Sequence, residues 1–186
     1  MVPLTQLWLP ILLAAVFVFI VSSVIHMVLG YHRSDFGKVS SEDEVMGALR
    51  KFEIPPGNYV MPCPEGPKGM KTPEFQEKMK AGPVAMITIR QSGPPSLTAN
   101  LILWFLYCIV VGVFAAYVAG RALGPRAQYL DVFRFAGTTA FAGYGLALMQ
   151  DSIWKGIKWS TTLKSMFDGL ISALITAGTL GWLWAK

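Results

Sequence analysis

The stretch from Leu7 to Gly30 reads LWLPILLAAVFVFIVSSVIHMVLG and contains no Asp, Glu, Lys or Arg. A second stretch, from Thr98 to Gly120, reads TANLILWFLYCIVVGVFAAYVAG and lacks the same residue types. An α-helix rises about 1.5 Å per residue, so roughly 20 apolar residues cross a hydrocarbon core about 30 Å thick. Both stretches are therefore predicted to span a membrane as helices.

Two further apolar stretches are shorter and contain some polar residues. One runs from Val132 to Gln150 and includes Arg134, and the other runs from Asp168 to Trp184. Both contain many Gly and Thr residues, which weaken a helix in water but are tolerated in lipid, where the helix satisfies its own backbone groups. This composition favours two more membrane helices over a soluble helical hairpin.

The predicted fold is an all-α membrane protein of four transmembrane helices, with a small α/β surface insert between helices 1 and 2. Residues 1–30 form the first transmembrane helix, residues 31–97 the extramembrane insert, and residues 98–186 transmembrane helices 2 to 4. Hydrophobic residues make up 53% of the 186 residues and charged residues only 15%, which is more apolar than a soluble domain of this size. The N-terminus lacks the basic segment and cleavage site of a signal peptide, so the first helix is expected to remain in the protein.

The insert is predicted to be ordered. Ser41 to Lys51 has the pattern of a short helix that begins with a capping box of Ser41 and Glu44. A second short helix is predicted from Pro73 to Ala81, where proline occupies the first helical position after Thr72. The alternating stretch from Ala85 to Arg90 is predicted to be a strand that pairs with Asn58 to Met61.

Tryptophans near the ends of the predicted helices are expected to be interfacial anchors, because indole rings prefer the level of the lipid headgroups. They are Trp8, Trp182 and Trp184 on one side and Trp104, Trp154 and Trp159 on the other. Basic residues are more frequent on the insert side, which places the insert in the cytoplasm and both termini in the periplasm. The basic loop from Arg121 to Tyr129 favours the opposite orientation. The segment from Ile153 to Thr161 is expected to be a linker in the interface plane.

Small residues recur at helical spacing in the last three predicted spans. Such residues let helix backbones approach closely, which is how helices commonly associate in lipid. The predicted packing residues are Gly112, Ala116, Gly120, Gly137, Gly143, Gly169, Ala173, Ala177 and Gly181. Close helix packing is favoured over a solute path lined by these residues.

His26 is the one ionisable residue well inside the first predicted span. Intramembrane ionisable residues are candidates for function, and His26 is the tentative cofactor-binding residue, through single axial ligation of a chlorin or haem. A bis-histidine haem needs a second histidine at similar depth, whereas His32 lies further out, so no cofactor is predicted. The favoured interpretation is a neutral His26 that is hydrogen-bonded to Asn100 or a span hydroxyl. His32 and Asp35 resemble half a metal site, but a solvated pair is favoured and no metal is predicted.

Three aspartates, Asp131, Asp151 and Asp168, are expected at helix ends, where they cap a helix or pair with a basic residue. Lys164 is the expected partner of Asp168. The sequence has no glycine-rich phosphate loop and no nucleophile beside a base, so no enzyme activity is predicted. The formal charge of +5 comes from scattered basic residues, which excludes nucleic acid as a predicted partner, and Cys63 and Cys108 have no metal-ligand spacing.

Three stretches resemble a group of small, uncharacterised bacterial four-span membrane proteins. They are His26 to Asp35 (HMVLGYHRSD), Ser41 to Lys51 (SEDEVMGALRK) and Gly169 to Lys186. The resemblance implies a multi-pass protein of the bacterial cytoplasmic membrane. It assigns no activity and no functional residue.

The leading functional hypothesis from the sequence is a non-catalytic accessory subunit that packs against a larger membrane complex of the respiratory or photosynthetic type. Its predicted partners are the bilayer and other membrane subunits. The alternative is a small transporter or ligand-binding membrane protein that uses His26, Asn100 and the hydroxyls of the third span. An enzyme with a metal at His32 and Asp35 ranks third.

Overall fold

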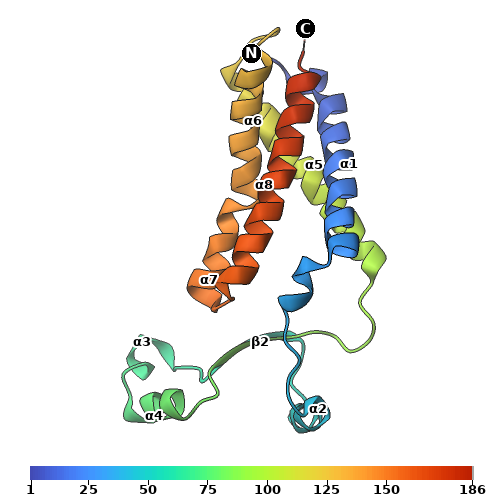
Figure 1. The fold of residues 1–186 in the computed structure, drawn as a ribbon. Coiled ribbons are helices and arrows are strands. Elements are labelled where there is room, and N and C mark those ends of the chain that lie inside the picture. Colours follow the sequence, from blue (N-terminus) through green and yellow to red (C-terminus); the bar gives the residue numbers. More distant parts are fainter. Residues whose placement is uncertain (186) are drawn as a thin grey trace. The chain divides into compact units, whose positions relative to one another are not determined.

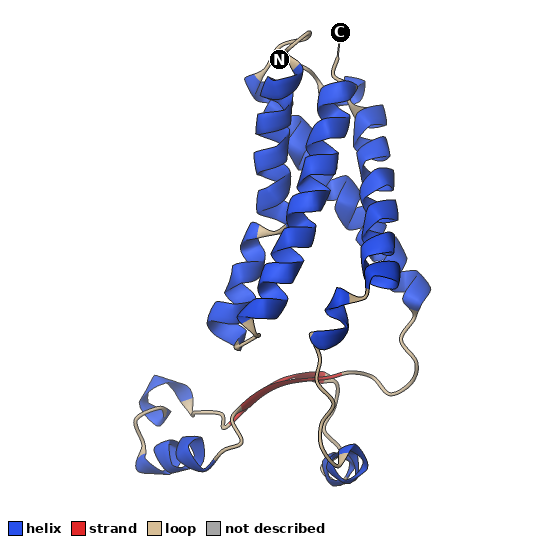
Figure 2. Ribbon diagram, in the orientation of Figure 1, coloured by secondary structure: helices blue, strands red, loops and turns tan. Residues whose placement is uncertain are grey.

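The computed structural model describes residues 1–185 and divides into two compact units. The first unit combines Met1–Gly37 with Ser96–Lys186, and the second is Lys38–Pro95. The residues just after the first helix, up to Gly37, thus belong with the helices, whereas the sequence boundary of the insert was drawn at residue 31. Figure 2 shows the first unit as helical and the two strands within the second.

The first unit is a bundle of helices (Figure 1). Helix α1 packs against α5 and α8, and α6 packs against the same two helices, so the four long helices form a closed ring. Short helical segments, labelled η, precede α1, follow it, and link α6 to α7. The bundle elements are η1 (Leu4–Gln6), α1 (Trp8–Val24), η2 (Ile25–Leu29), η3 (Tyr31–Ser34), α5 (Leu97–Ala122), α6 (Tyr129–Tyr144), η4 (Leu146–Leu148), α7 (Met149–Lys155) and α8 (Trp159–Trp182).

Two helical stretches are long and apolar enough to cross a membrane, as predicted. They are Trp8–Leu29, with 22 residues, and Leu97–Ala122, with 26 residues. Helix α6 has only 16 residues and ends at Tyr144, and α8 has 24 residues but includes more polar side chains. The third and fourth spans therefore stay predictions.

Both termini lie at one end of the bundle, beside the loop between α5 and α6 (Figure 1). The backbone N–H of Val2 donates to the carbonyl of Gly120 at 2.8 Å, which ties the N-terminus to the end of α5. The indole Nε1 of Trp184 donates to the carbonyl of Gly124 at 3.1 Å. The polar cluster described below lies at the other end of the bundle.

The predicted interfacial linker from Ile153 to Thr161 is wrong. Helix α7 continues to Lys155, Gly156 makes the turn with a φ of +69°, and α8 begins at Trp159. The apolar pattern did not predict that α8 begins at Trp159, because the first turns of this helix are polar. As a consequence Asp168 lies within α8. Its predicted position at the N-terminal end of that helix is wrong.

The small residues expected at helix contacts lie where the bundle helices touch one another. A Cβ atom at Gly169 would lie 2.8 Å from the carbonyl oxygen of Tyr144, and one at Gly181 would lie 2.8 Å from the Tyr129 ring. Cβ atoms at Gly112, Gly120, Gly137 and Gly143 would lie between 2.6 and 3.3 Å from Ile11, Val2, Ala177 and Val111, and Ala116, Ala173 and Ala177 are buried. The helix backbones can approach this closely because these side chains are so small.

The second unit contains a two-stranded antiparallel sheet and three short helices. Strand β1 (Gly57–Met61) pairs with β2 (Ala85–Ile89), as predicted, with Tyr59 opposite Ile87. The helices are α2 (Glu42–Arg50), α3 (Gly66–Gly69) and α4 (Pro73–Ala81). Thr72 caps α4 by accepting from the N–H of Phe75 at 3.3 Å. The predicted capping box is wrong, because Ser41 has a φ of 50° and its side chain caps no N–H of α2.

Candidate functional site

The chain reverses sharply after α1 and returns toward the bundle. Helix α1 runs into the π-helical segment η2, and π-helical turns are frequent at functional sites. Gly30 then has a φ of +64°, a left-handed conformation that glycine adopts without strain, and η3 follows. This reversal stacks the ring of His32 on that of His26, with centroids 4.8 Å apart and planes inclined by 3°.

Each histidine has an oxygen acceptor at Nδ1. The Nδ1 of His26 lies 3.0 Å from the carbonyl oxygen of Ser22, and the Nδ1 of His32 lies 2.5 Å from Oδ2 of Asp35. A carbonyl or carboxylate oxygen only accepts, so each Nδ1 carries the hydrogen. The Nε2 atom of each ring is therefore the one that faces the next residue of the site.

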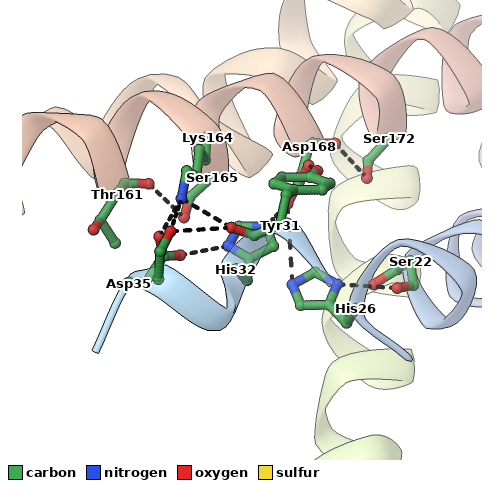
Figure 3. Close-up of polar contacts among 11 residues, drawn as sticks. Ser22, His26, Tyr31, His32, Asp35, Thr161, Lys164, Ser165, Asp168 and Ser172 are labelled. Atoms are coloured by element: carbon green, nitrogen blue, oxygen red, sulfur yellow. Dashed lines mark hydrogen bonds and ion pairs between the residues drawn. The ribbon is translucent and has the colours of Figure 1, made fainter. Parts of the chain in front are cut away.

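That residue is Asp168, which α8 places opposite both rings (Figure 3). Its Oδ2 atom lies 2.6 Å from Nε2 of His32 and 4.0 Å from Nε2 of His26. Its Oδ1 atom accepts the hydroxyl proton of Tyr31. One carboxylate thus contacts three side chains of the η2–η3 segment.

Lys164 fixes the same segment to α8 one turn earlier. Its ammonium donates to Oδ1 of Asp35 at 2.8 Å, to Oγ of Ser34 at 2.8 Å and to the carbonyl of Tyr31 at 2.9 Å, which uses all three of its hydrogens. The Lys164 ammonium, followed by the His32 ring, holds the pKa of Asp35 below its ordinary value of 3.8. The predicted pairing of Lys164 with Asp168 is wrong. Lys164 pairs with Asp35, and Asp168 pairs with the histidines.

A cavity of about 310 Å³ opens beside His26 and Asp168. Its walls come from α1, η2, α5, α6, η4 and α8, and most of the lining is apolar or aromatic. The hydroxyl of Tyr107 donates to the carbonyl of Gly143 at 2.6 Å, and that of Tyr144 donates to the carbonyl of Cys108 at 3.4 Å. Trp104 also lines this wall, and its indole Nε1 is buried and has no hydrogen-bond partner within residues 1–185.

The structure brings some of the sequence candidates together and separates others. His26, His32 and Asp35 join one cluster, but Asn100 is exposed, so the expected partner of His26 is replaced by Ser22 and Asp168. The stacked histidines do not point their nitrogens at each other, so the arrangement does not suit a bis-histidine haem. Trp8, Trp154, Trp159 and Trp182 are exposed, whereas Trp104 lines the cavity and Trp184 is buried.

Sequence reasoning missed three members of the cluster, namely Tyr31, Lys164 and Asp168. A signal for the last two was present. Thr161, Ser165, Asp168 and Ser172 follow one another at steps of three or four residues, and Lys164 lies three residues after Thr161 and four before Asp168, which is the spacing of a single polar helix face. That stripe becomes visible only when α8 is extended back to Trp159.

Comparison with known proteins found no matching family model, no similar curated protein and no similar solved structure. The function is therefore argued from the site.

Proposed function

We propose that the protein is a four-span integral membrane protein that binds a small ligand in the cavity beside His26. The observation that carries this proposal is the cavity itself, which combines aromatic walls, one unpaired indole N–H and a fixed cluster of histidine and aspartate side chains. Pockets that bind small molecules are mostly apolar with a few placed polar groups. It shares His26 with the ligand-binding alternative that the sequence suggested, but Asn100, which that alternative also used, does not line the cavity.

The distribution of side chains on α8 supports a location in lipid. Leu163, Phe167, Leu170 and Leu174 lie on its outer surface and are between 41% and 58% exposed. Its inner surface instead buries small and hydroxyl-bearing residues, among them Ser172, Thr176 and Thr179. In water each square ångström of exposed apolar surface is unfavourable by about 25 cal/mol, whereas lipid tails remove that cost. This reversed amphipathicity favours α8, and with it α6, as the fourth and third spans.

Trp104 indicates what the ligand must offer. Leaving its N–H buried without an acceptor costs roughly 1–3 kcal/mol, and a ligand in the cavity recovers this energy when the indole ring turns its N–H toward a carbonyl oxygen of that ligand. The hydroxyls of Tyr107 and Tyr144 already donate to backbone carbonyls. The ligand is therefore an apolar molecule with a hydrogen-bond acceptor.

Solvent extraction of the purified protein tests ligand binding. Protein purified in mild detergent is extracted with organic solvent, and the small molecules are quantified by mass spectrometry. The variant Trp104→Phe removes the donor but keeps most of the ring, and Trp159→Phe, an exposed tryptophan of α8, is the matched control. We expect one carbonyl-bearing molecule near equimolar amount in wild type and Trp159→Phe, and at least a tenfold loss in Trp104→Phe. Equal extracts from all three proteins contradict the proposal.

An accessory role in a larger membrane complex stays a second proposal. Its main support was the small-residue faces, and these are occupied by helix contacts within the chain, as at Gly169 and Gly181. Mild extraction tests it directly. The accessory role requires that the protein migrates in a large particle with other subunits, and a monodisperse monomer or small homo-oligomer counts against it.

A further inference from the structure

We propose that His26, His32 and Asp168 together bind one divalent transition-metal ion. One ligand atom from each residue lies within 4.8 Å of the other two. The spacings between Oδ2 of Asp168 and the two Nε2 atoms are 2.6 and 4.0 Å. An ion bound tetrahedrally at about 2.0–2.1 Å holds its ligand atoms roughly 3.3 Å apart. The two Asp168 distances have to change by less than about 1 Å each, and the two histidine nitrogens, at most 4.8 Å apart, have to approach by up to about 1.5 Å through rotation of their side chains.

The groups around these residues have the arrangement that supports metal ligands. Metal-binding histidines usually donate their second ring N–H to a carbonyl or carboxylate, which fixes the ring and its tautomer. Both histidines do so, His26 to Ser22 and His32 to Asp35. Asp35 is in turn held by Lys164, and the second oxygen of Asp168 by Tyr31. Every proposed ligand is thus oriented before an ion arrives.

The position of His26 favours a metal site over a cluster that is held by hydrogen bonds alone. With the hydrogen on Nδ1, a neutral His26 directs the lone pair of Nε2 toward a carboxylate oxygen of Asp168 4.0 Å away. Two electron-rich atoms at this distance gain nothing from each other, but a cation between them interacts favourably with both. His32 is hydrogen-bonded to Asp168, whereas His26 is hydrogen-bonded only to Ser22 and directs its Nε2 toward Asp168 without a hydrogen bond to it.

The ligand set indicates the class of ion. Two imidazoles and one carboxylate suit zinc, and they suit the ferrous ion in sites that keep open coordination positions. Metal binding releases to solvent the hydrogen that lies between Nε2 of His32 and Oδ2 of Asp168. With two neutral histidines and one carboxylate as ligands, a bound divalent ion then leaves a net charge of +1. His26 and Asp168 also line the cavity, so the ion is accessible from it. Metal binding extends the proposed function, but it does not depend on the organic ligand.

Titration with cobalt tests the inference, because Co²⁺ has visible absorption that reports its ligand geometry. The experiment uses the full chain in detergent after chelator treatment, carries Cys63→Ser to remove the exposed thiol, and measures stoichiometry by elemental analysis and zinc competition. We expect one Co²⁺ per chain, displaced by Zn²⁺. His26→Ala and Asp168→Asn are expected to weaken binding at least about 100-fold, and Asp35→Asn about 10- to 100-fold.

Asp131→Asn is the matched control. It removes a carboxylate that pairs with Arg134 on α6, away from the three proposed ligands, and this variant should bind Co²⁺ like wild type. His26 is 54% exposed in its side chain, so His26→Ala should keep the helical circular dichroism even if Asp168→Asn does not. Absence of stoichiometric Co²⁺ binding, or equal affinities in His26→Ala, Asp131→Asn and wild type, overturns the inference. Because no organic ligand is added, that result leaves the cavity proposal standing.

Discussion

At the residue scale, a few charged side chains join parts of the chain that are far apart in sequence. Asp168 bonds to His32 across 136 positions, and Lys164 bonds to Asp35 across 129. The side chain of Asp35 is only 5% exposed, and a buried charge is tolerated only when it is paired and hydrogen-bonded. The η2–η3 segment is thus fixed to α8 by ionic contacts, whereas the rest of the bundle is held by apolar packing.

The lowered pKa of Asp35 predicts acid sensitivity. A carboxylate whose pKa is lower in the folded state stabilises the fold above its unfolded pKa, near 3.8, and this contribution is lost as the pH falls through the folded pKa. We expect the unfolding temperature in detergent to fall between pH 5 and pH 3 in wild type and to fall less in Asp35→Asn. Asp43→Asn, which changes an exposed carboxylate of the second unit, should keep the wild-type fall. Identical pH profiles of wild type and Asp35→Asn would contradict the role of Asp35.

At the element scale, the sequence predicted helices better than it predicted their ends. The spans that contain α1 and α5 follow from uninterrupted apolar runs, and strand β2, which pairs with β1, follows from an alternating pattern. The start of α8 does not follow from hydropathy, because its charged side chains, Lys164 and Asp168, are satisfied by a distant segment rather than by neighbours in sequence. The Asp168 site was unpredictable for the same reason. A single sequence gives no measure of contacts between residues this far apart.

The contact between α8 and the end of α6 is close and can be tested at Gly169. A Cβ atom there would lie 2.8 Å from both the Gly145 backbone and the Tyr144 carbonyl, and neither can move without shifting α6. Gly169→Ala should therefore lower the free energy of unfolding by about 1–3 kcal/mol. Gly178→Ala is the matched control on the same helix, because its Cβ would lie 3.5 Å from the Tyr129 hydroxyl, an ordinary contact. Equal denaturation midpoints for the two variants would show that this approach is not tight.

At the scale of the whole molecule, the bundle has small and hydroxyl-bearing residues inside and large apolar residues outside. Alanines such as Ala115, Ala136 and Ala177 are fully buried, while Phe114, Phe167 and Trp182 are exposed. A protein that folds in water has the reverse arrangement, because burying large apolar groups drives its folding. In a bilayer the helices associate through close packing of small residues instead. The arrangement is the one expected for helices in lipid, and it is consistent with the third and fourth spans proposed above.

The native thiol of Cys63 makes the predicted topology measurable. Cys63 is exposed in the second unit and Cys108 is buried, so a membrane-impermeant maleimide should modify Cys63 alone. With the insert in the cytoplasm, we expect modification in inverted vesicles and none in right-side-out vesicles. In a Cys63→Ser background, Gly124→Cys, in the exposed loop after α5, should show the opposite pattern.

The same assay decides whether α6 and α8 span the membrane. Ser160→Cys places an exposed thiol at the start of α8, and it should be modified from the same side as Cys63 if α6 with α7 crosses the bilayer. A C-terminal epitope tag should then be accessible from the side of Gly124→Cys, because α8 returns the chain. Modification of Ser160→Cys from the side of Gly124→Cys would mean that the third span does not cross. A reversed pattern at every position would keep four spans and invert the orientation, as the basic loop containing Arg121 and Arg126 favours.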